Sequence, residues 1–117
     1  MPDNVLVVNR TYDLIVDLVP QLARFPRSYR FVLGEKIERD LYSVLDGLLD
    51  AQYGRDRAAA LRQVNVELER LRFRIRLAKD LKVISLKRYE MVAAELLEIG
   101  KMVGGWLRSQ ARPHAGA

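Results

Sequence analysis

The chain has 117 residues, of which 50% are hydrophobic and 30% are charged, and its formal net charge is +5. This length suits one domain with one core, and the absence of cysteine excludes disulfides and thiolate metal sites. Because no run of about 18 uncharged apolar residues occurs, we expect a cytoplasmic protein that does not enter the membrane.

Turn signals at Pro26, Gly54 and Ser85 divide the chain into four long segments. Each segment has apolar residues at the three- and four-residue spacing of an amphipathic helix. The first segment contains Pro20, which should bend the helix or remove a backbone hydrogen bond. Its predicted core positions are Val8, Tyr12, Ile15, Val19 and Leu22. Those of the second segment are Leu33, Ile37, Leu41, Val44 and Leu48.

The third segment contains an ambiguous stretch, because arginine occupies every second position from Arg70 to Arg76. Strict alternation is typical of a strand, but the helical spacing of apolar residues continues through the stretch, so we predict a helix. On a helix, Arg70 and Arg74 lie on one side of the apolar stripe, and Arg72, Arg76 and Lys79 lie on the other. The predicted core positions are Leu61, Val64, Leu68, Leu71, Ile75 and Ala78.

The fourth segment follows Ser85, a suitable N-cap residue. Its predicted core positions are Leu86, Tyr89, Ala93, Leu96, Gly100, Val103 and Leu107. Residues 111–117 are small and rich in helix breakers, which predicts a disordered tail after a single domain of residues 1–110. Four helices of roughly 20 residues with short connections predict an all-α fold, an antiparallel up-down four-helix bundle.

Positive charge is concentrated in the third segment. Residues 55–82 hold nine Lys or Arg against four acids, so this segment alone accounts for the whole excess of +5. A localised excess favours a polyanionic partner, such as the backbone of RNA or DNA. The residues predicted to bind nucleic acid, and with it any polymerase that acts on the same strand as implied by the resemblance given below, are Arg70, Arg72, Arg74, Arg76, Lys79, Lys82, Lys87 and Arg88. The alternative is a solvated face, in which Arg70 and Arg72 pair with Glu67 and Glu69 three residues earlier.

Two segments carry apolar residues outside their core stripes. Val66, Phe73 and Leu77 share the outer side of the third helix. On the fourth, Val92, Ile99 and Trp106 are spaced by seven residues. Scattered exposed apolar residues are common in monomers, but stripes of this kind also close homo-oligomers. We predict that these six residues form the interface of a closed homo-oligomer.

Catalysis is not predicted for this chain. The only histidine, His114, lies in the tail, where nothing holds it against a nucleophile or base. The acid pairs Asp13/Asp17 and Asp46/Asp50 lack the Glu-x-x-His element of di-metal bundles, so we expect them to be solvated. We therefore expect no enzymatic activity, no metal and no cofactor.

One stretch resembles a known family. The run RFPRSYRFVLGEKIERDLYSVLDGLLDAQY at residues 24–53 contains FPRSYRF at 25–31, LGEKIER at 33–39, and Ala51. It resembles the loop and second helix of the Avd proteins, the accessory variability determinants of diversity-generating retroelements, and of their relatives, the four-helix rRNA intervening-sequence proteins. The resemblance extends more loosely over residues 5–109, and FPR followed by LG favours the Avd branch.

The resemblance implies a basic, barrel-like homopentamer that binds the reverse transcriptase of the retroelement and its template RNA. Such a protein has no enzymatic activity and supports the synthesis of mutagenised cDNA. The motif transfers no binding residues, and Arg24, Arg27 and Arg30 within it have the simpler role of solvating a turn. Two alternatives stay open: an rRNA intervening-sequence type of bundle, and a structural module whose basic face binds an acidic protein.

Overall fold

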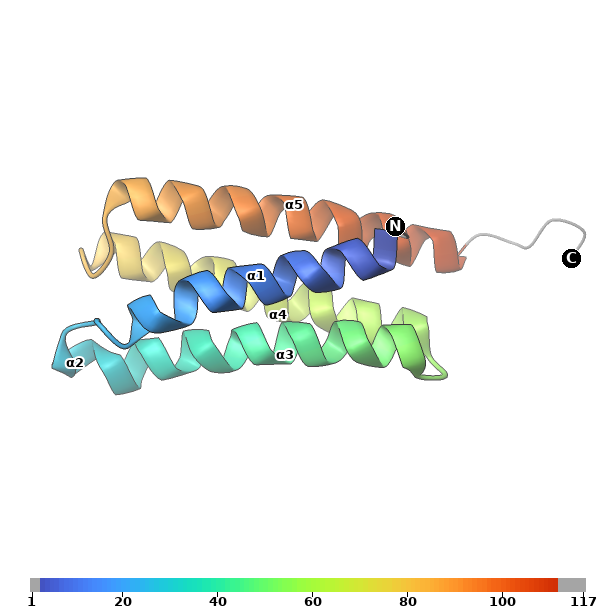
Figure 1. The fold of residues 1–117 in the computed structure, drawn as a ribbon, viewed down its shortest axis with the longest axis horizontal. Helices are drawn as coiled ribbons and strands as arrows, with labels where there is room; N and C mark the ends of the chain where they lie inside the picture. Colours follow the sequence, from blue (N-terminus) through green and yellow to red (C-terminus); the bar gives the residue numbers. More distant parts are fainter. Residues whose placement is uncertain (1–2, 112–117) are drawn as a thin grey trace, which may run out of the picture.

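The computed structural model describes residues 3–111, which form four long helices and no strand (Figure 1). The long helices are α1 (Asp3–Leu22), α3 (Glu35–Tyr53), α4 (Arg57–Asp80) and α5 (Leu86–Ala111). Between α1 and α3, the chain forms a short helix, α2 (Arg27–Tyr29), and one π-helical turn, η1 (Arg30–Gly34). Of the tail predicted for residues 111–117, Ala111 belongs to α5, and residues 112–117 lie outside the described residues.

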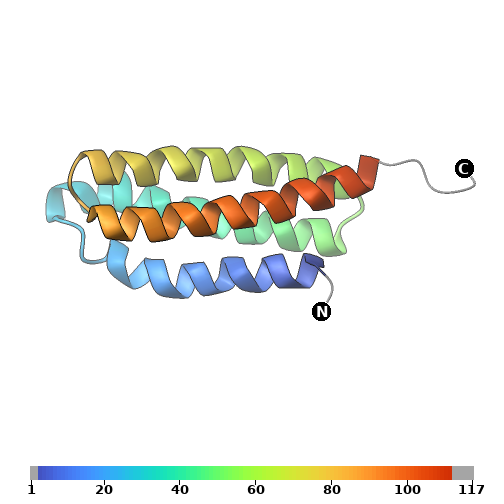
Figure 2. The same cartoon turned by 90° about the horizontal axis from the view of Figure 1, so that it is seen from above.

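The long helices pack as a bundle, which confirms the predicted all-α class. Each packs against two neighbours, in the order α1, α3, α4, α5 and back to α1. The connections α1–α3 and α4–α5 lie at one end of the rod, and the α3–α4 connection lies at the other (Figures 1 and 2). None of the helices in this described part combines the length and the apolar run needed to cross a lipid bilayer.

The core positions predicted for α3 and α4 are confirmed. All eleven are buried, and none is more than 4% exposed. Gly54 ends α3 as predicted, because its N–H donates to the Asp50 carbonyl oxygen at 2.7 Å and a Cβ atom at this position would collide with that same oxygen. Helix α4 then begins at an N-cap, since Asp56 Oδ1 accepts from the Ala59 N–H at 3.0 Å.

The core stripe predicted for α1 is displaced by about one residue. Its buried positions are Val7, Thr11, Leu14, Leu18 and Leu22, whereas Tyr12 is 56% exposed. Two overlapping series of residues with helical spacing run through this segment. The buried series contains a polar residue, Thr11, so it was not recognised as an apolar stripe. The Thr11 hydroxyl donates to the Val7 carbonyl oxygen at 2.9 Å, so its burial leaves no unpaired donor. Helix α1 continues past the exposed Pro20 to Leu22.

The stripe predicted for α5 is only partly correct, and this changes part of the predicted oligomer interface. Leu96 and Val103 are buried as predicted, at 1% and 0% exposed, whereas Leu86 is 61% exposed. Val92 and Ile99 are 2% and 0% exposed and belong to the core, and Trp106 is partly buried against it. Val92 and Ile99 therefore have no free surface for another molecule. The stripe through these residues buries larger aliphatic side chains than the predicted one through Ala93 and Gly100, so it removes more apolar area from water.

Candidate nucleic-acid interface

Two of the predicted arginines connect α4 to its neighbours instead of facing solvent. Arg74 reaches α3, where its Nη1 donates to Asp40 Oδ1 at 2.6 Å, and Asp40 is only 5% exposed. Arg72 lies on the opposite side of α4 and donates to the Leu96 carbonyl oxygen of α5 at 3.3 Å. Arg74 and Arg72 lie on opposite sides of α4, as predicted. Each of them, however, forms hydrogen bonds to a neighbouring helix, which were not predicted.

Most of the other predicted binding residues also have carboxylate neighbours. Arg70 pairs with Glu67 at 3.1 Å and Arg72 with Glu69 at 3.0 Å, as the solvated-face alternative predicts. Three further pairs are Arg76–Asp80 at 3.9 Å, Lys79–Asp80 at 3.3 Å and Arg88–Asp17 at 3.1 Å. Within residues 3–111, Lys82 and Lys87 are the two predicted residues without an ion pair to a described carboxylate.

The surplus charge collects at one end of the rod, which we call the basic end: residues 23–34 and residues 79–88. The two segments are brought together by the fold, because both connect helices at the same end (Figure 1). Its cationic residues are Arg24, Arg27, Arg30, Lys79, Lys82, Lys87 and Arg88. Its single acid is Asp80, so seven cations and one anion give +6. The rest of the chain is therefore close to neutral, at −1.

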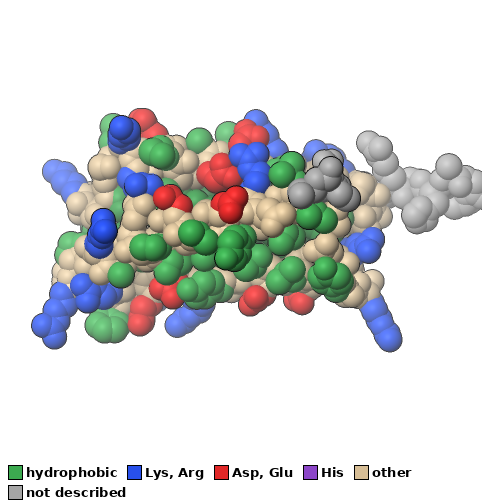
Figure 3. Space-filling view, in the orientation of Figure 1, with side chains coloured by type: hydrophobic (Ala, Val, Ile, Leu, Met, Phe, Trp, Pro, Cys, Tyr) green, Lys and Arg blue, Asp and Glu red, His purple; other side chains and the backbone are tan. Residues whose placement is uncertain are grey.

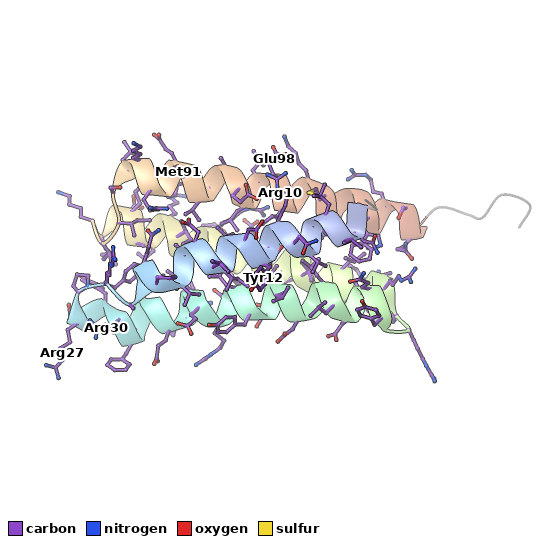
Figure 4. All side chains as sticks on the ribbon, in the orientation of Figure 1. Arg10, Tyr12, Arg27, Arg30, Met91 and Glu98 are labelled. Atoms are coloured by element: carbon purple, nitrogen blue, oxygen red, sulfur yellow. The ribbon has the colours of Figure 1, made fainter. Side chains whose placement is uncertain are left out.

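The arginines between α1 and α3 are accessible, as are Lys82 and Lys87. Arg24, Arg27 and Arg30 are exposed, and none forms an ion pair with a carboxylate of residues 3–111. Lys and Arg side chains crowd this end in Figure 3, and Arg27 and Arg30 point away from the bundle in Figure 4. These three were assigned only a solvating role from the sequence, although RFPRSYR contains three arginines and no acid.

A hollow of about 290 Å³ separates the two connections of the basic end. Its lining residues come from both segments: Gln21, Arg24, Phe25, Val83, Ile84, Ser85 and Arg88. Ser85 caps α5 as predicted, since its Oγ accepts from the Arg88 N–H at 3.1 Å. Phe25, 3% exposed, anchors the first connection in the core. Phe25, Val83 and Ile84 thus give the hollow apolar lining, and each of the two segments contributes one arginine, Arg24 or Arg88.

The π-helical turn adds apolar surface beside the arginines. In η1, Leu33 and Gly34 face inward, whereas Phe31 and Val32 are 64% and 61% exposed. A Cβ atom at Gly34 would lie 3.4 Å from the Phe25 ring, an ordinary van der Waals contact, so this turn packs against the buried Phe25. Isolated π-helical turns often occur at functional positions. Phe31 therefore gives the basic end an exposed aromatic ring, which the arginines of α4 were not predicted to have.

The second connection depends on an unusual backbone conformation. Lys82 has φ of 62°, in the left-handed region. It follows the last turn of α4, where the Val83 N–H donates to the Ala78 carbonyl oxygen at 2.8 Å. This conformation reverses the chain within five residues, and it places Lys82 in the exposed part of the turn.

Comparisons with known proteins agree with the bundle. A family model described as bAvd-like matches residues 5–110. A crystal structure of a protein of unknown function from the S23 ribosomal protein family of Bacteroides thetaiotaomicron is similar, with a TM-score of 0.84. It is 16% identical in sequence, and the match covers 92% of this chain and 99% of that one. No curated protein matches the sequence.

Proposed function

Because the chain belongs to the bAvd-like family, we propose that it is a non-enzymatic accessory protein of a diversity-generating retroelement. In this role it binds the reverse transcriptase of the retroelement and its template RNA, and so supports mutagenic cDNA synthesis in the cytoplasm. Family membership over residues 5–110 is the observation that carries the proposal. The proposal includes an antiparallel up-down order of the helices and their assembly into a closed homo-oligomer, with a pentamer as the expected size.

The basic end is the site we propose for RNA. Its three accessible arginines, Arg24, Arg27 and Arg30, present guanidinium groups that match phosphate oxygens. Paired arginines of α4 are poorer candidates, because RNA would have to compete with carboxylates already in place. Phe31 offers a surface on which an unpaired base stacks, a contact that tolerates every base. We therefore expect RNA binding with little sequence preference.

A triple variant of the accessible arginines tests this site. We expect Arg24→Ala, Arg27→Ala and Arg30→Ala together to lower the affinity for the template RNA by at least tenfold at about 0.1 M salt, because three phosphate contacts are lost. Fluorescence anisotropy with labelled template RNA measures the affinity. Co-purification with the reverse transcriptase measures the second interaction separately.

The matched control removes the same charge elsewhere. Arg39→Ala, Arg55→Ala and Arg108→Ala change exposed arginines outside the basic end, so RNA affinity should fall by less than about threefold. If both triple variants weaken binding equally, net charge alone explains it and the basic end has no special role. Neither triple should change the unfolding temperature appreciably.

The main alternative is a structural module whose basic end binds an acidic protein. Exposed arginines without carboxylate partners favour any polyanion, so this alternative rests on the same side chains. A gel shift with RNA at several salt concentrations distinguishes the RNA-binding function from this alternative. The alternative predicts that the protein does not shift the RNA band at any salt concentration. For an rRNA intervening-sequence type of protein, the similar S23-family structure supports only the fold, since it is 16% identical.

A further inference from the structure

The bundle has two layers of opposite charge. The layer of α1 and α3 holds eight acids and three bases, a net charge of −5. The layer of α4 and α5 holds eleven bases and six acids, a net charge of +5. Lys79, Asp80, Lys87 and Arg88 of this layer also belong to the basic end, and without them the layer of α4 and α5 still holds eight bases and five acids, a net charge of +3. Opposite long sides of the rod therefore differ in sign even when the basic end is left out.

The acidic layer carries an exposed apolar patch, which we call the α1/α3 patch. Its members are Tyr12, Val16, Tyr42 and Leu49, which are 56%, 57%, 41% and 37% exposed. In Figure 3, hydrophobic side chains gather along the middle of the side where α1 crosses in front of α3, with acidic side chains along α3. Tyr12 lies at the junction of these two helices in Figure 4.

Contacts on the other sides of the two helices confirm that the patch spans their junction. Arg10 donates to Glu95 of α5 at 2.9 Å, and Tyr12, about 200° further round α1, faces the α3 side. Asp40 pairs with Arg74 of α4, and Tyr42, again two residues on, faces the α1 side. The Tyr42 hydroxyl donates to Glu38 at 2.9 Å, and this hydrogen bond raises the pKa of Tyr42.

The basic layer carries a second patch, which we call the α4 patch: Val66, Phe73 and Leu77. These side chains are 44%, 60% and 46% exposed and lie on the outer side of α4. Arg70, Arg74 and Glu69 line the same surface hollow as Val66 and Phe73. The α4 patch is thus apolar in a helix with seven bases and three acids, whereas the α1/α3 patch is apolar in an acidic layer.

We infer that the α1/α3 patch of one copy of this chain packs against the α4 patch of the next copy, head to tail. This inference rests on the homo-oligomer in the proposed function and supplies its missing second surface. The pairing buries apolar side chains from both partners and brings an acidic layer against a basic one. Asp46 and Asp50, which have no ion pair with a described residue, border the contact from the α3 side.

Charge argues against a two-fold contact between identical patches. Packing α4 against α4 would bring together two helices that each carry a net charge of +4, and juxtaposed like charges are unfavourable. A head-to-tail contact avoids this repulsion and generates a ring when the rotation closes. With 24 residues, α4 is about 36 Å long. A contact of that length, two helices wide, approaches the roughly 800 Å² per partner of a standard interface.

Mixing two blocked copies tests the inference. Val16→Arg blocks the α1/α3 patch, and Phe73→Asp blocks the α4 patch, each with a charge that repels the opposing layer. By light scattering coupled to gel filtration, we expect wild type to be an oligomer and each variant alone to be a monomer. An equimolar mixture should form a 1:1 dimer and stop there, because one intact patch remains on each copy. Native mass spectrometry identifies the two subunits in that dimer.

Several results would overturn the inference: a monomeric wild type, a Val16→Arg variant that assembles normally, or a mixture that stays monomeric. The control is Leu97→Asp, which changes an apolar residue of α5 that is 52% exposed and outside both patches. It should assemble like wild type. Melting curves show whether each variant is folded. RNA binding by the basic end is measured separately, so a failure of assembly and a failure of RNA binding are distinguishable.

Discussion

Asp40 is the most deeply buried acid that the structure describes, with an exposed fraction of 5%. Its partner Arg74 retains 32% of its side-chain exposure. We predict that Asp40→Ala lowers the free energy of unfolding by about 2 kcal/mol, because the guanidinium loses its partner at the α3–α4 contact. The effect stays below the roughly 3–5 kcal/mol of a fully buried pair, since Arg74 can turn toward water. Urea denaturation measures the change.

The matched control for Asp40 is Glu69→Ala, which removes the partner of Arg72. Glu69 keeps 60% of its side-chain exposure, so the loss should be below about 0.5 kcal/mol. Equal losses for the two variants would contradict the structural role of the Arg74–Asp40 pair.

Lys82 combines a strained backbone with a charge at the basic end. With φ of 62°, it occupies a region that costs a non-glycine residue about 1 kcal/mol. We therefore predict that Lys82→Gly raises the free energy of unfolding by about 0.5–1 kcal/mol, although it removes a cation. Thermal unfolding with calorimetry measures the gain. Lys101→Gly, in the interior of α5 and exposed, should instead lower stability by about 1 kcal/mol, because glycine is unfavourable inside a helix.

At the scale of the helix, the spacing of apolar residues determined the elements but did not always determine which side of them is buried. In α3 and α4, one series of large aliphatic residues stands out, so the core was predicted correctly. In α1 and α5, two series overlap with a displacement of one residue, and periodicity alone cannot choose between them. The choice follows from tertiary packing, as in the burial of Thr11 with its hydroxyl bonded to Val7. The shift is what leaves Tyr12 exposed.

Two glycines in helices offer a matched pair of predictions about helix contacts. A Cβ atom at Gly47 of α3 would lie 2.5 Å from Val64 Cγ2 of α4, in the buried contact of the two helices. We predict that Gly47→Ala lowers the free energy of unfolding by about 1 kcal/mol, because overpacking costs more than the helix propensity gained. Chemical denaturation measures this change.

Gly100 of α5 meets the Arg72 guanidinium instead of a stiff core side chain. Arg72 can move aside only by giving up its hydrogen bond to the Leu96 carbonyl oxygen, so this loss offsets the gain in helix propensity and Gly100→Ala should change stability by less than about 1 kcal/mol. Adding Val64→Ala to Gly47→Ala should remove the clash but not help Gly100→Ala, and a double-mutant cycle shows this difference. An unchanged free energy of unfolding for Gly47→Ala would contradict this prediction, because it would mean that α3 and α4 can shift apart at this contact without loss of stability.

At the scale of the whole molecule, the charge count along the sequence placed the excess positive charge in α4. In the folded protein, the excess lies at the basic end, which holds seven cations and one acid. Asp40 and Asp17 come from other helices and pair with Arg74 and Arg88, which a count within one segment cannot include. Two short connections that are distant in sequence meet at the same end and bring their cations together. The composition of RFPRSYR was the available signal for this site, but only topology shows which other segment lies beside it.

The basic end also predicts how salt acts on RNA binding. For single-stranded RNA, the logarithm of the association constant should fall linearly with the logarithm of the salt concentration, with a slope of about −0.7 per phosphate engaged. The triple variant of Arg24, Arg27 and Arg30 should therefore reduce the slope by about 2. Titrations at several salt concentrations measure it. A lower affinity with an unchanged slope would mean that the arginines shape the turn and do not contact phosphate.

Helix α1 begins and helix α5 ends at the end of the rod away from the basic end (Figure 2). An affinity tag or fluorescent protein fused next to either of these helix ends is thus attached at the end of the rod opposite the basic end, which stays accessible. Coupling to a sensor chip through a terminal tag presents the basic end to the solution, whereas random coupling through amines would consume Lys82 and Lys87. The proposed RNA site therefore predicts that protein coupled through a terminal tag captures more template RNA than protein coupled through its amines.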